Sequence, residues 1–206
     1  MPAYSEQELI AGCRNQNRAI QEQLYKMYYS MFLKVCARYA KDMQDAEQLI
    51  NDGFLKIFNN INKFGNNGSF EGWMRRIMVN TCLDYLRSKY MKEEMVMHVN
   101  SIPAEQSSIA VNSVALESME FKELVKIIQL LPTMTRTVFN LYVFDGYNHV
   151  QIGEQLRISE KTSQWHVHQA RNFLQKKIKQ NDSISVTYET TPVVKHYSDT
   201  RSSDAL

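Results

Sequence analysis

Side chains that could form base contacts lie close together near the C-terminal end of the chain. They are Lys161, Thr162, Gln164, Trp165, His168, Gln169 and Arg171. Each glutamine amide carries a donor beside an acceptor, and this pair of groups matches the major-groove edge of adenine. Lys176, Lys177 and Lys179 follow, although a basic helix end can also simply complement the helix dipole. These residue types favour sequence-dependent DNA binding over a purely structural role.

A helix-turn-helix pattern would position these side chains on one outer face. A short amphipathic segment with Val150, Ile152 and Leu156 ends at a tight connection, residues 157–159. Ser159 is a typical N-cap for the second helix, since its hydroxyl can accept from a free backbone N–H. In that helix an apolar residue recurs every three or four positions, at Val167, Ala170, Leu174 and Ile178. The polar side chains fall elsewhere, so the second helix could enter a DNA major groove.

Two residues of this pattern have particular packing or backbone requirements. Gly153 is small at the point where the two helices must approach closely. Arg157 stands in the turn, at a position that usually has a left-handed conformation and favours glycine. A left-handed arginine would be strained by about 1 kcal/mol. Helix pairs of this kind are also common packing units, so the pattern alone does not separate a DNA-binding module from a scaffold.

The composition favours a helical protein of one or two domains. The chain has 206 residues, of which 44% are hydrophobic, and this is enough to build real cores. Seven glycines and four prolines are few for a turn-rich β fold. The net charge of +2 is small, so any affinity for nucleic acid must come from local patches.

Cysteine usage and targeting signals indicate the compartment. The three cysteines, Cys13, Cys36 and Cys82, each fall within a helical pattern and show no metal-ligand spacing. We expect them to be buried thiols of a reducing cytoplasm. The N-terminus has no basic segment followed by an apolar run, and no apolar stretch is long enough to span a bilayer. A cytoplasmic protein is therefore expected.

The N-terminal half is expected to form four helices. Ser5 and Glu8 have the spacing of a capping box before a short first helix, and a second helix runs to about Ala40. The inner face of the third helix has a helical period, with Ala46, Ile50, Gly53, Ile57 and Ile61. Ser69 would cap a fourth helix that reaches to about Tyr90.

The rest of the chain divides by composition. Residues 100–115 are polar and small, with Pro103, and are expected to form a flexible linker. Further helices follow, separated at Leu131-Pro132 and at the turn signal Asp145-Gly146. Residues 181–206 are rich in Ser, Thr and Asp without an apolar period, and we expect a disordered tail.

Three segments together resemble a known protein family. They read DAEQLINDGFLKIF (45–58), FEGWMRRIMVNTCLDYLRSK (70–89) and the helix-turn-helix at 148–179. In this order and spacing they closely resemble the extracytoplasmic-function (ECF) group of RNA polymerase sigma factors. The resemblance implies an all-α fold of two small helical domains joined by a flexible linker, the second containing the helix-turn-helix. The implied boundaries are 1–98 for sigma region 2, 99–116 for the linker, 117–180 for sigma region 4 and 181–206 for the disordered tail.

The resemblance also implies a protein-docking helix. In the family the segment at 45–58 docks on the coiled coil of the polymerase β′ subunit, and the matching positions are Asp45, Glu47, Leu49, Asn51, Asp52 and Leu55. Leu55 lies off the inner stripe, so we expect an exposed apolar residue among acids, as an interface anchor would be. Without the family, a loosely packed core leucine would be the favoured interpretation of Leu55. Asn51 and Asp52 stand where longer Gln and Glu are usual.

Two DNA contacts follow from the same resemblance. The positions that match those holding the melted strand of the minus-ten element are Asn80, Asp84, Arg87, Ser88 and Lys89. The base-reading loop, expected at 90–99, has no clear family pattern. The positions that match those reading the minus-thirty-five element, in a domain that also touches the β flap, are Lys161, Thr162, Gln164, Trp165, His168, Gln169 and Arg171. Gln169 stands where Arg is common and Trp165 where a small residue is common, so we expect an unusual minus-thirty-five preference with adenine in place of guanine.

The resemblance implies core RNA polymerase and promoter DNA as partners, and an anti-sigma factor is a common further partner in the group. An enzyme is not expected, because the five histidines form no metal spacing with carboxylates. The chain also lacks a phosphate-binding glycine loop and a nucleophile motif, so no catalytic residue, metal or cofactor is assigned.

Two other functions fit parts of the pattern. One is a stand-alone helix-turn-helix regulator that binds duplex DNA without polymerase, with the N-terminal helices as a sensing or dimerising module. The other is a helical adaptor that binds no nucleic acid. The acidic helix with Leu55 favours a sigma factor over the regulator, because a stand-alone regulator has no need of a polymerase-docking surface. Salt-dependent DNA binding would separate both from the adaptor.

Overall fold

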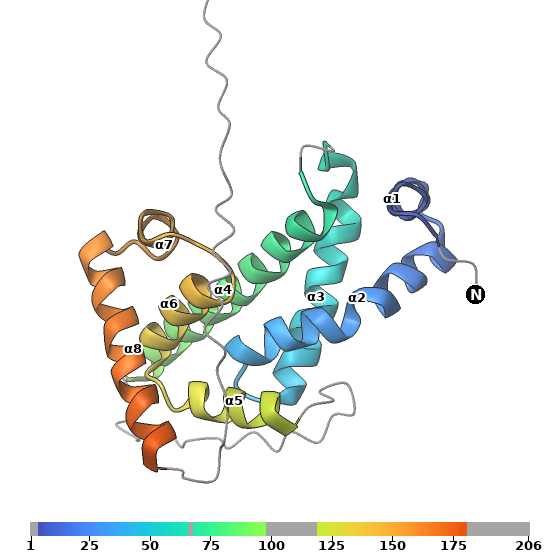
Figure 1. Cartoon of the computed structure of the whole chain (residues 1–206). Helices are drawn as coiled ribbons and strands as arrows, with labels where there is room; N and C mark the ends of the chain where they lie inside the picture. Colours follow the sequence, from blue (N-terminus) through green and yellow to red (C-terminus); the bar gives the residue numbers. More distant parts are fainter. Residues whose placement is uncertain (1–3, 66–67, 98–118, 181–206) are drawn as a thin grey trace, which may run out of the picture.

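The computed structural model describes residues 4–65, 68–97 and 119–180, and in these residues the secondary structure is helical (Figure 1). The first domain contains α1 (Glu6–Arg14), α2 (Arg18–Tyr39), α3 (Met43–Asn60), the 3-10 turn η1 (Ile61–Lys63) and α4 (Phe70–Met97). The second contains α5 (Met119–Gln129), α6 (Thr133–Val143), α7 (His149–Leu156) and α8 (Glu160–Gln180). The expected all-α fold is confirmed. The expected linker and tail lie outside the described residues.

Serine caps begin three of these helices where the sequence predicts them. Ser5 and Glu8 form the capping box of α1, with Ser5 Oγ accepting from the Glu8 N–H at 3.3 Å. Ser69 Oγ accepts from the Gly72 N–H at 3.2 Å, and Ser159 Oγ accepts from the Thr162 N–H at 3.0 Å. Each bond satisfies a backbone donor that the first turn of a helix leaves free.

Three helices, α2, α3 and α4, enclose the core of the first domain (Figure 1). Phe32, Ile50, Phe54, Met74 and Met78 are fully buried between them. Gly53 lets α4 come close, because a Cβ atom there would lie 2.3 Å from Met78 Sδ. The predicted inner stripe of α3 is therefore confirmed, and the other face of α3 is exposed.

The fourth helix is longer than the sequence indicated. It ends at Met97 rather than near Tyr90. The prediction of a base-reading loop at 90–99 is therefore wrong for residues 90–97, which are helical. Residues 91–97 consist mostly of Met, Lys and Glu, which are good helix formers and give no stop signal. The last two residues of the expected loop lie outside the described residues.

The helix-turn-helix of the second domain is formed by α7 and α8, which pack on α6. Arg157 ends α7 in the left-handed conformation, with φ 57° and ψ 44°, as predicted. A Cβ atom at Gly153 would lie 2.8 Å from the carbonyl oxygen of Ile158, so this glycine allows the close approach of the turn. Pro132 precedes the first turn of α6.

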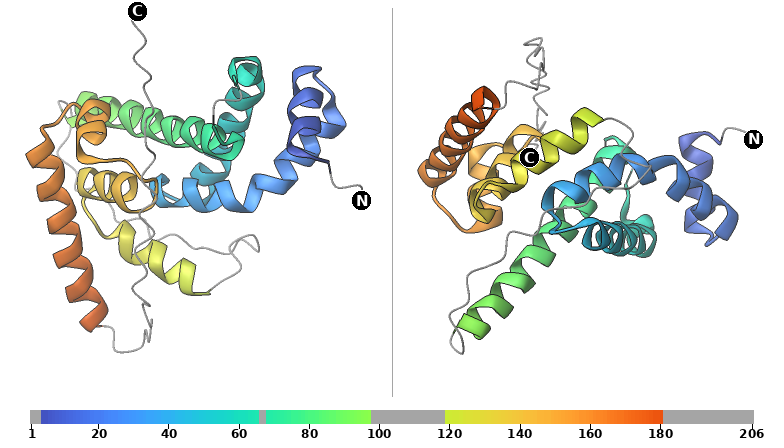
Figure 2. Two further views of the ribbon diagram at one scale, coloured as in Figure 1. Left: turned by 45° about the horizontal axis from the view of Figure 1, so that its top comes forward. Right: turned by 90° about the horizontal axis from the view of Figure 1, so that it is seen from below.

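The two domains pack directly on one another. Helices α5 and α6 contact α2, while α1 lies at the opposite end of the molecule from α8 (Figures 1 and 2). Val138, Leu141, Ile152 and Val167 of the second domain belong to the same apolar cluster as the core of the first. Among the described residues, none of the helices combines the length and apolar character that a bilayer crossing requires.

Candidate functional site

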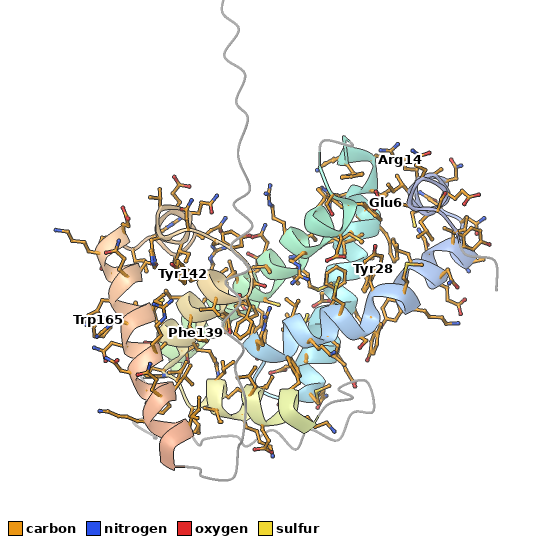
Figure 3. All side chains as sticks on the ribbon, viewed as in Figure 1. Glu6, Arg14, Tyr28, Phe139, Tyr142 and Trp165 are labelled. Atoms are coloured by element: carbon orange, nitrogen blue, oxygen red, sulfur yellow. The ribbon has the colours of Figure 1, made fainter. Side chains whose placement is uncertain are left out.

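The outer face of α8 carries the predicted base-reading residues. Lys161, Gln164, His168, Gln169 and Arg171 are exposed, and 55% of the Trp165 surface is accessible. Figure 3 shows Trp165 on the outer side of α8, away from Phe139 and Tyr142. Thr162 is half-buried and its hydroxyl lies 2.8 Å from Ser159 Oγ at the start of the helix. The structure thus brings six of the seven predicted side chains to the surface of one helix.

Two histidine contacts hold α8 against the rest of its domain. His149 Nδ1 of α7 lies 2.9 Å from Ser163 Oγ, and His166 Nδ1 lies 2.9 Å from Thr135 Oγ of α6. The His149 ring also stacks on Tyr142, with 4.4 Å between the ring centroids. Burial lowers the pKa of both imidazoles, which favours their neutral forms. These contacts fix the rotation of α8 and therefore the direction of its polar face.

Side chains on the polar face of α8 bond to neighbours one turn away. Gln164 Nε2 donates to Glu160 Oε1 at 3.1 Å, and Asn172 Nδ2 lies 2.9 Å from His168 Nε2. The Arg171 guanidinium lies 5.9 Å from the centre of the Tyr142 ring. Bonds between exposed side chains of one helix are weak, so contacts to DNA could replace them.

The predicted docking residues of α3 have unequal access to solvent. Leu55 is 60% exposed, and Glu47, Asn51 and Asp52 are also exposed. Leu49, by contrast, is only 2% exposed and packs in the core, so its expected role as a surface contact does not fit its position. The reason lies in the helical period, because Leu49 is three residues after Ala46 and four before Gly53 on the inner stripe. Asp45 is partly buried.

A groove of about 430 Å³ lies between α3 and α4. Its lining combines leucines with acids and polar groups: Asp45, Gln48, Leu49, Asp52, Leu55, Lys56, Thr81, Asp84, Tyr85 and Ser88. The Tyr85 hydroxyl donates to Asp45 Oδ2 across it, and burial keeps the pKa of this tyrosine above its usual range. Predicted docking residues and predicted minus-ten residues therefore line the same groove, although they belong to separate segments of the sequence.

The predicted minus-ten residues follow one another along α4. Asn80 is half-buried, while Asp84, Arg87 and Ser88 are exposed, and the helix continues through Lys89. Asp84 accepts from Lys56 Nζ and from Arg87 Nη1, each at 3.1 Å. Arg87 Nη2 also donates to the carbonyl oxygen of Gln155 in α7, at 2.8 Å. A residue expected to hold DNA thus contacts the other domain in this arrangement.

A buried ion pair between the domains was not expected from the sequence. Arg38 Nη2 of α2 lies 2.8 Å from Asp145 Oδ1 in the turn between α6 and α7. Their side chains are 7% and 0% exposed. The sequence marked Asp145 only as a turn residue, and no local pattern relates it to an arginine 107 positions away.

The described residues contain no group of three His, Cys, Asp or Glu side chains placed to hold a metal ion. All three cysteines are buried, as the sequence predicts, and Cys36 Sγ lies 3.9 Å from Cys82 Sγ. The exposed faces of α3 and α8 present apolar, amide, carboxylate and cationic groups.

Two family models match the chain, Sigma-70 region 2 over residues 24–90 and Sigma-70 region 4 over residues 121–174. The ECF RNA polymerase sigma factor SigW of Bacillus subtilis is 26% identical over 160 residues, covering 74% of this chain and 86% of the relative. The RNA polymerase sigma-H factor of Pseudomonas aeruginosa is 21% identical over 182 residues, covering 83% and 92%. The solved structure of CnrH in complex with the cytosolic domain of CnrY is 17% identical, covers 84% of this chain and 96% of that chain, and has a TM-score of 0.49.

The two family models together span more than half of the chain, in the order that the sequence motifs predicted. Sigma factors bind core RNA polymerase and promoter DNA and direct the start of transcription. This chain belongs to the extracytoplasmic-function group of RNA polymerase sigma factors.

Proposed function

We propose that this sigma factor acts through three surfaces: α3 docks on the β′ coiled coil of core polymerase, α4 holds the melted minus-ten strand, and α8 reads the minus-thirty-five duplex. The supporting observation is the exposure of each helix face that carries the matching residues. The first domain would extend over 1–98 and the second over 117–180, since α4 ends at Met97 and α5 begins at Met119. The chain itself would catalyse no reaction and would work in the cytoplasm with polymerase.

The docking surface is proposed to consist of Glu47, Asn51, Asp52 and Leu55, with Asp45 at its edge. Leu55 carries most of this assignment. It is 60% exposed on a helix whose neighbouring Phe54 and Ile57 are buried, so its side chain has no place in the core. An exposed leucine surrounded by carboxylates fits a partner with an apolar pocket bordered by basic residues. An anti-sigma factor that covered this face would compete with polymerase for it.

The strand-binding surface is proposed to run along α4 from Asn80 to Lys89. Arg87 is the main cationic group here whose contacts are described, and Ser88 offers a hydroxyl beside it. Arginine can contact a phosphate and stack on an unpaired base, so it suits a single strand. The Asp84 carboxylate fixes Arg87 at 3.1 Å and would reject a misplaced phosphate.

The reading surface is proposed to prefer A·T pairs. Gln164 and Gln169 can each bond to the paired donor and acceptor of adenine, and the exposed Trp165 ring offers an apolar surface to a thymine methyl group. Lys161 and Arg171 would contact phosphates at the edges of the same groove. A recognition helix with neutral amides at its centre and cations outside them would disfavour a guanine-rich element.

A reconstituted transcription assay tests the assignment. The purified chain is added to core polymerase on a library of promoter fragments, and strand opening is followed by reactivity of unpaired thymines. We expect opening only when both proteins are present, at sites with an A·T-rich upstream element. Tight, sequence-specific binding by the chain alone, with no effect of polymerase, would instead support the stand-alone regulator.

A further inference from the structure

We propose that Glu160, the first residue of α8, is a specificity-determining residue for the minus-thirty-five element. Its carboxylate accepts from the N4 amino group of one cytosine and repels bases that present only acceptors in the major groove. The proposal rests on the reading role proposed above for α8. It adds one C·G pair to an element that Gln164 and Gln169 are proposed to make rich in A·T pairs.

Glu160 occupies the part of the helix-turn-helix that is best placed to reach base edges. It begins α8 directly after Ser159, and its side chain is exposed, as are those of Lys161 and Gln164. The N-terminal residues of a recognition helix are those that contact bases. Gln164 follows one turn later on the same face. An acidic group thus lies where the helix would enter the groove.

The backbone at the start of α8 does not require this carboxylate. The Ser159 hydroxyl accepts from the Thr162 N–H at 3.0 Å, so a serine already caps the helix. Glu160 also takes part in none of the ion pairs found among the described residues, although Lys161 follows it directly. The Glu160 carboxylate is therefore neither the cap of its helix nor half of a salt bridge there.

One hydrogen bond links Glu160 to a predicted reading residue. Gln164 Nε2 donates to Glu160 Oε1 at 3.1 Å. An amide nitrogen carries two protons, so Gln164 keeps its second proton and its oxygen for adenine. Within the described part of the chain, Glu160 Oε2 accepts no hydrogen bond. Both side chains can therefore face the groove together, and each keeps groups that can bond to a base.

The major-groove edges of the bases differ in what they offer a carboxylate. Cytosine presents its N4 amino donor with no acceptor beside it, and adenine presents its N6 amino donor beside the N7 acceptor. Guanine and thymine present acceptors at this edge. Because an ionised carboxylate can only accept, cytosine fits Glu160 best and guanine fits it worst. Four residues of α-helix span about 6 Å, so this cytosine lies within about two base pairs of the adenine that Gln164 reads.

The charge of Glu160 also reduces affinity for DNA of any sequence. Lys161 and Arg171 on the same helix attract phosphates, whereas Glu160 repels them. Only a base that donates to the carboxylate offsets this repulsion, so the residue acts mainly by weakening binding to wrong sequences. Replacing Glu160 by a neutral residue should therefore raise the total affinity for DNA and lower the selectivity.

Two structural roles would place an acid at the same position. A negative charge in the first turn interacts favourably with the helix dipole. The charge of Glu160 also acts on His149 of α7, whose pKa burial lowers and Glu160 raises. Either role predicts that a neutral variant changes the stability of the domain and leaves its base preference unaltered. Base preference is therefore the quantity that separates recognition from these roles.

Selection of upstream sequences by the holoenzyme tests the proposal. The full chain and its Glu160→Gln variant are each bound to core polymerase and to promoter fragments randomised over the minus-thirty-five region, and the bound fragments are sequenced. We expect the unaltered chain to select cytosine at one position. Glu160→Gln should lower that preference by about fivefold or more, with adenine gaining there, because glutamine pairs with adenine. Binding to fragments without this cytosine should become tighter, and thermal unfolding checks that the variant is folded.

Glu154→Gln is the matched control, since Glu154 is exposed on α7, outside the recognition helix, and its replacement removes the same charge. We expect it to leave every base preference unchanged. Clear upstream selection that is the same for the unaltered chain and Glu160→Gln would overturn the role of Glu160 and leave the reading role of α8 intact. Selection of guanine or thymine at the position that responds to Glu160→Gln would also overturn it. No upstream selection by the unaltered chain would overturn both roles.

Discussion

The exposed faces of α3 and α8 hold their polar side chains in different ways. On α3, Asn51 Oδ1 accepts from the Tyr25 hydroxyl of α2 at 2.9 Å, and Asp45 accepts from Tyr85 of α4. On α8, Gln164 and His168 bond to side chains of the same helix. The α3 face is thus organised by the domain core before a partner arrives, which reduces the side-chain entropy lost on binding. The side chains of the α8 face can rearrange to fit base edges, because their hydrogen bonds are to side chains of the same helix.

The largest effect is expected at Leu55. Leu55→Asp replaces the exposed apolar anchor by a charge and should weaken binding to core polymerase by about 2 kcal/mol or more, roughly thirtyfold. Titration of the labelled chain with core polymerase measures this change. Thermal stability should be almost unaltered, because the side chain is already 60% exposed.

Met27→Asp is the control for Leu55→Asp. Met27 is 48% exposed on α2, two residues from Tyr25, and therefore points away from the side of α2 that contacts α3. We expect it to leave polymerase binding within about twofold, as a surface change outside an interface would. Equal losses in the two variants would show that α3 has no special docking role.

On the α8 face, Gln169→Arg should change which sequence is read more than how tightly DNA is bound. Arg pairs with the O6 and N7 atoms of guanine, so the preferred base at one upstream position should change from adenine to guanine. The binding free energy should discriminate against the wrong base by about 1–3 kcal/mol. Selection of upstream sequences with the reconstituted holoenzyme measures the change. Polymerase affinity should not change.

Gln175→Arg adds the same charge on α8 at another exposed position, six residues further along. It should strengthen binding to all sequences slightly and equally, through phosphates alone. If both variants gave this uniform effect, Gln169 would not contact a base.

The elements of both faces were predictable because their signals are local. The caps at Ser5, Ser69 and Ser159 and the inner stripe of α3 depend on neighbours within a few residues, and all are confirmed. Leu55 lies off the inner stripe by its helical spacing, and the resemblance to the family favoured an exposed position over a loosely packed core one, as the structure shows. Leu49 was assigned by resemblance alone, against its own spacing, and is buried.

Long-range contacts were not predictable. Asp145 had the signal of a turn, yet its carboxylate binds Arg38 across 107 positions, and nothing in either segment indicates the pairing. The helix end expected near Tyr90 was wrong for a different reason, because it did not take into account the strong helix propensity of residues 91–97. The relation between the domains, and the groove that α3 and α4 share, required the structure.

A smaller effect tests whether α3 is organised in advance. Tyr25→Phe removes the hydroxyl that donates to Asn51 while keeping the ring, which packs 4.7 Å from Phe54 between centroids. Polymerase affinity should fall by about 1 kcal/mol or less, roughly fivefold at most, because Asn51 must then be ordered on binding. The same titration measures it, with Tyr29→Phe as control, since that ring packs on Tyr25 at 5.4 Å. An unchanged affinity for Tyr25→Phe would mean that the α3 face needs no such organisation.

The smallest effect concerns the support of α8. Burial lowers the pKa of His149 and His166 below the ordinary value of 6.5, so the unfolded chain takes up protons at a higher pH than the folded one. Stability from the neutral imidazoles is therefore fully present above about pH 6.5 and is lost as the pH falls through the folded-state pKa. Thermal unfolding between pH 7.5 and about pH 5 should show this loss, reduced in His166→Asn, which keeps a polar group near Thr135 but does not titrate. If the variant and the unaltered chain lost stability equally, carboxylates elsewhere would control the response and α8 would not depend on its histidine contacts.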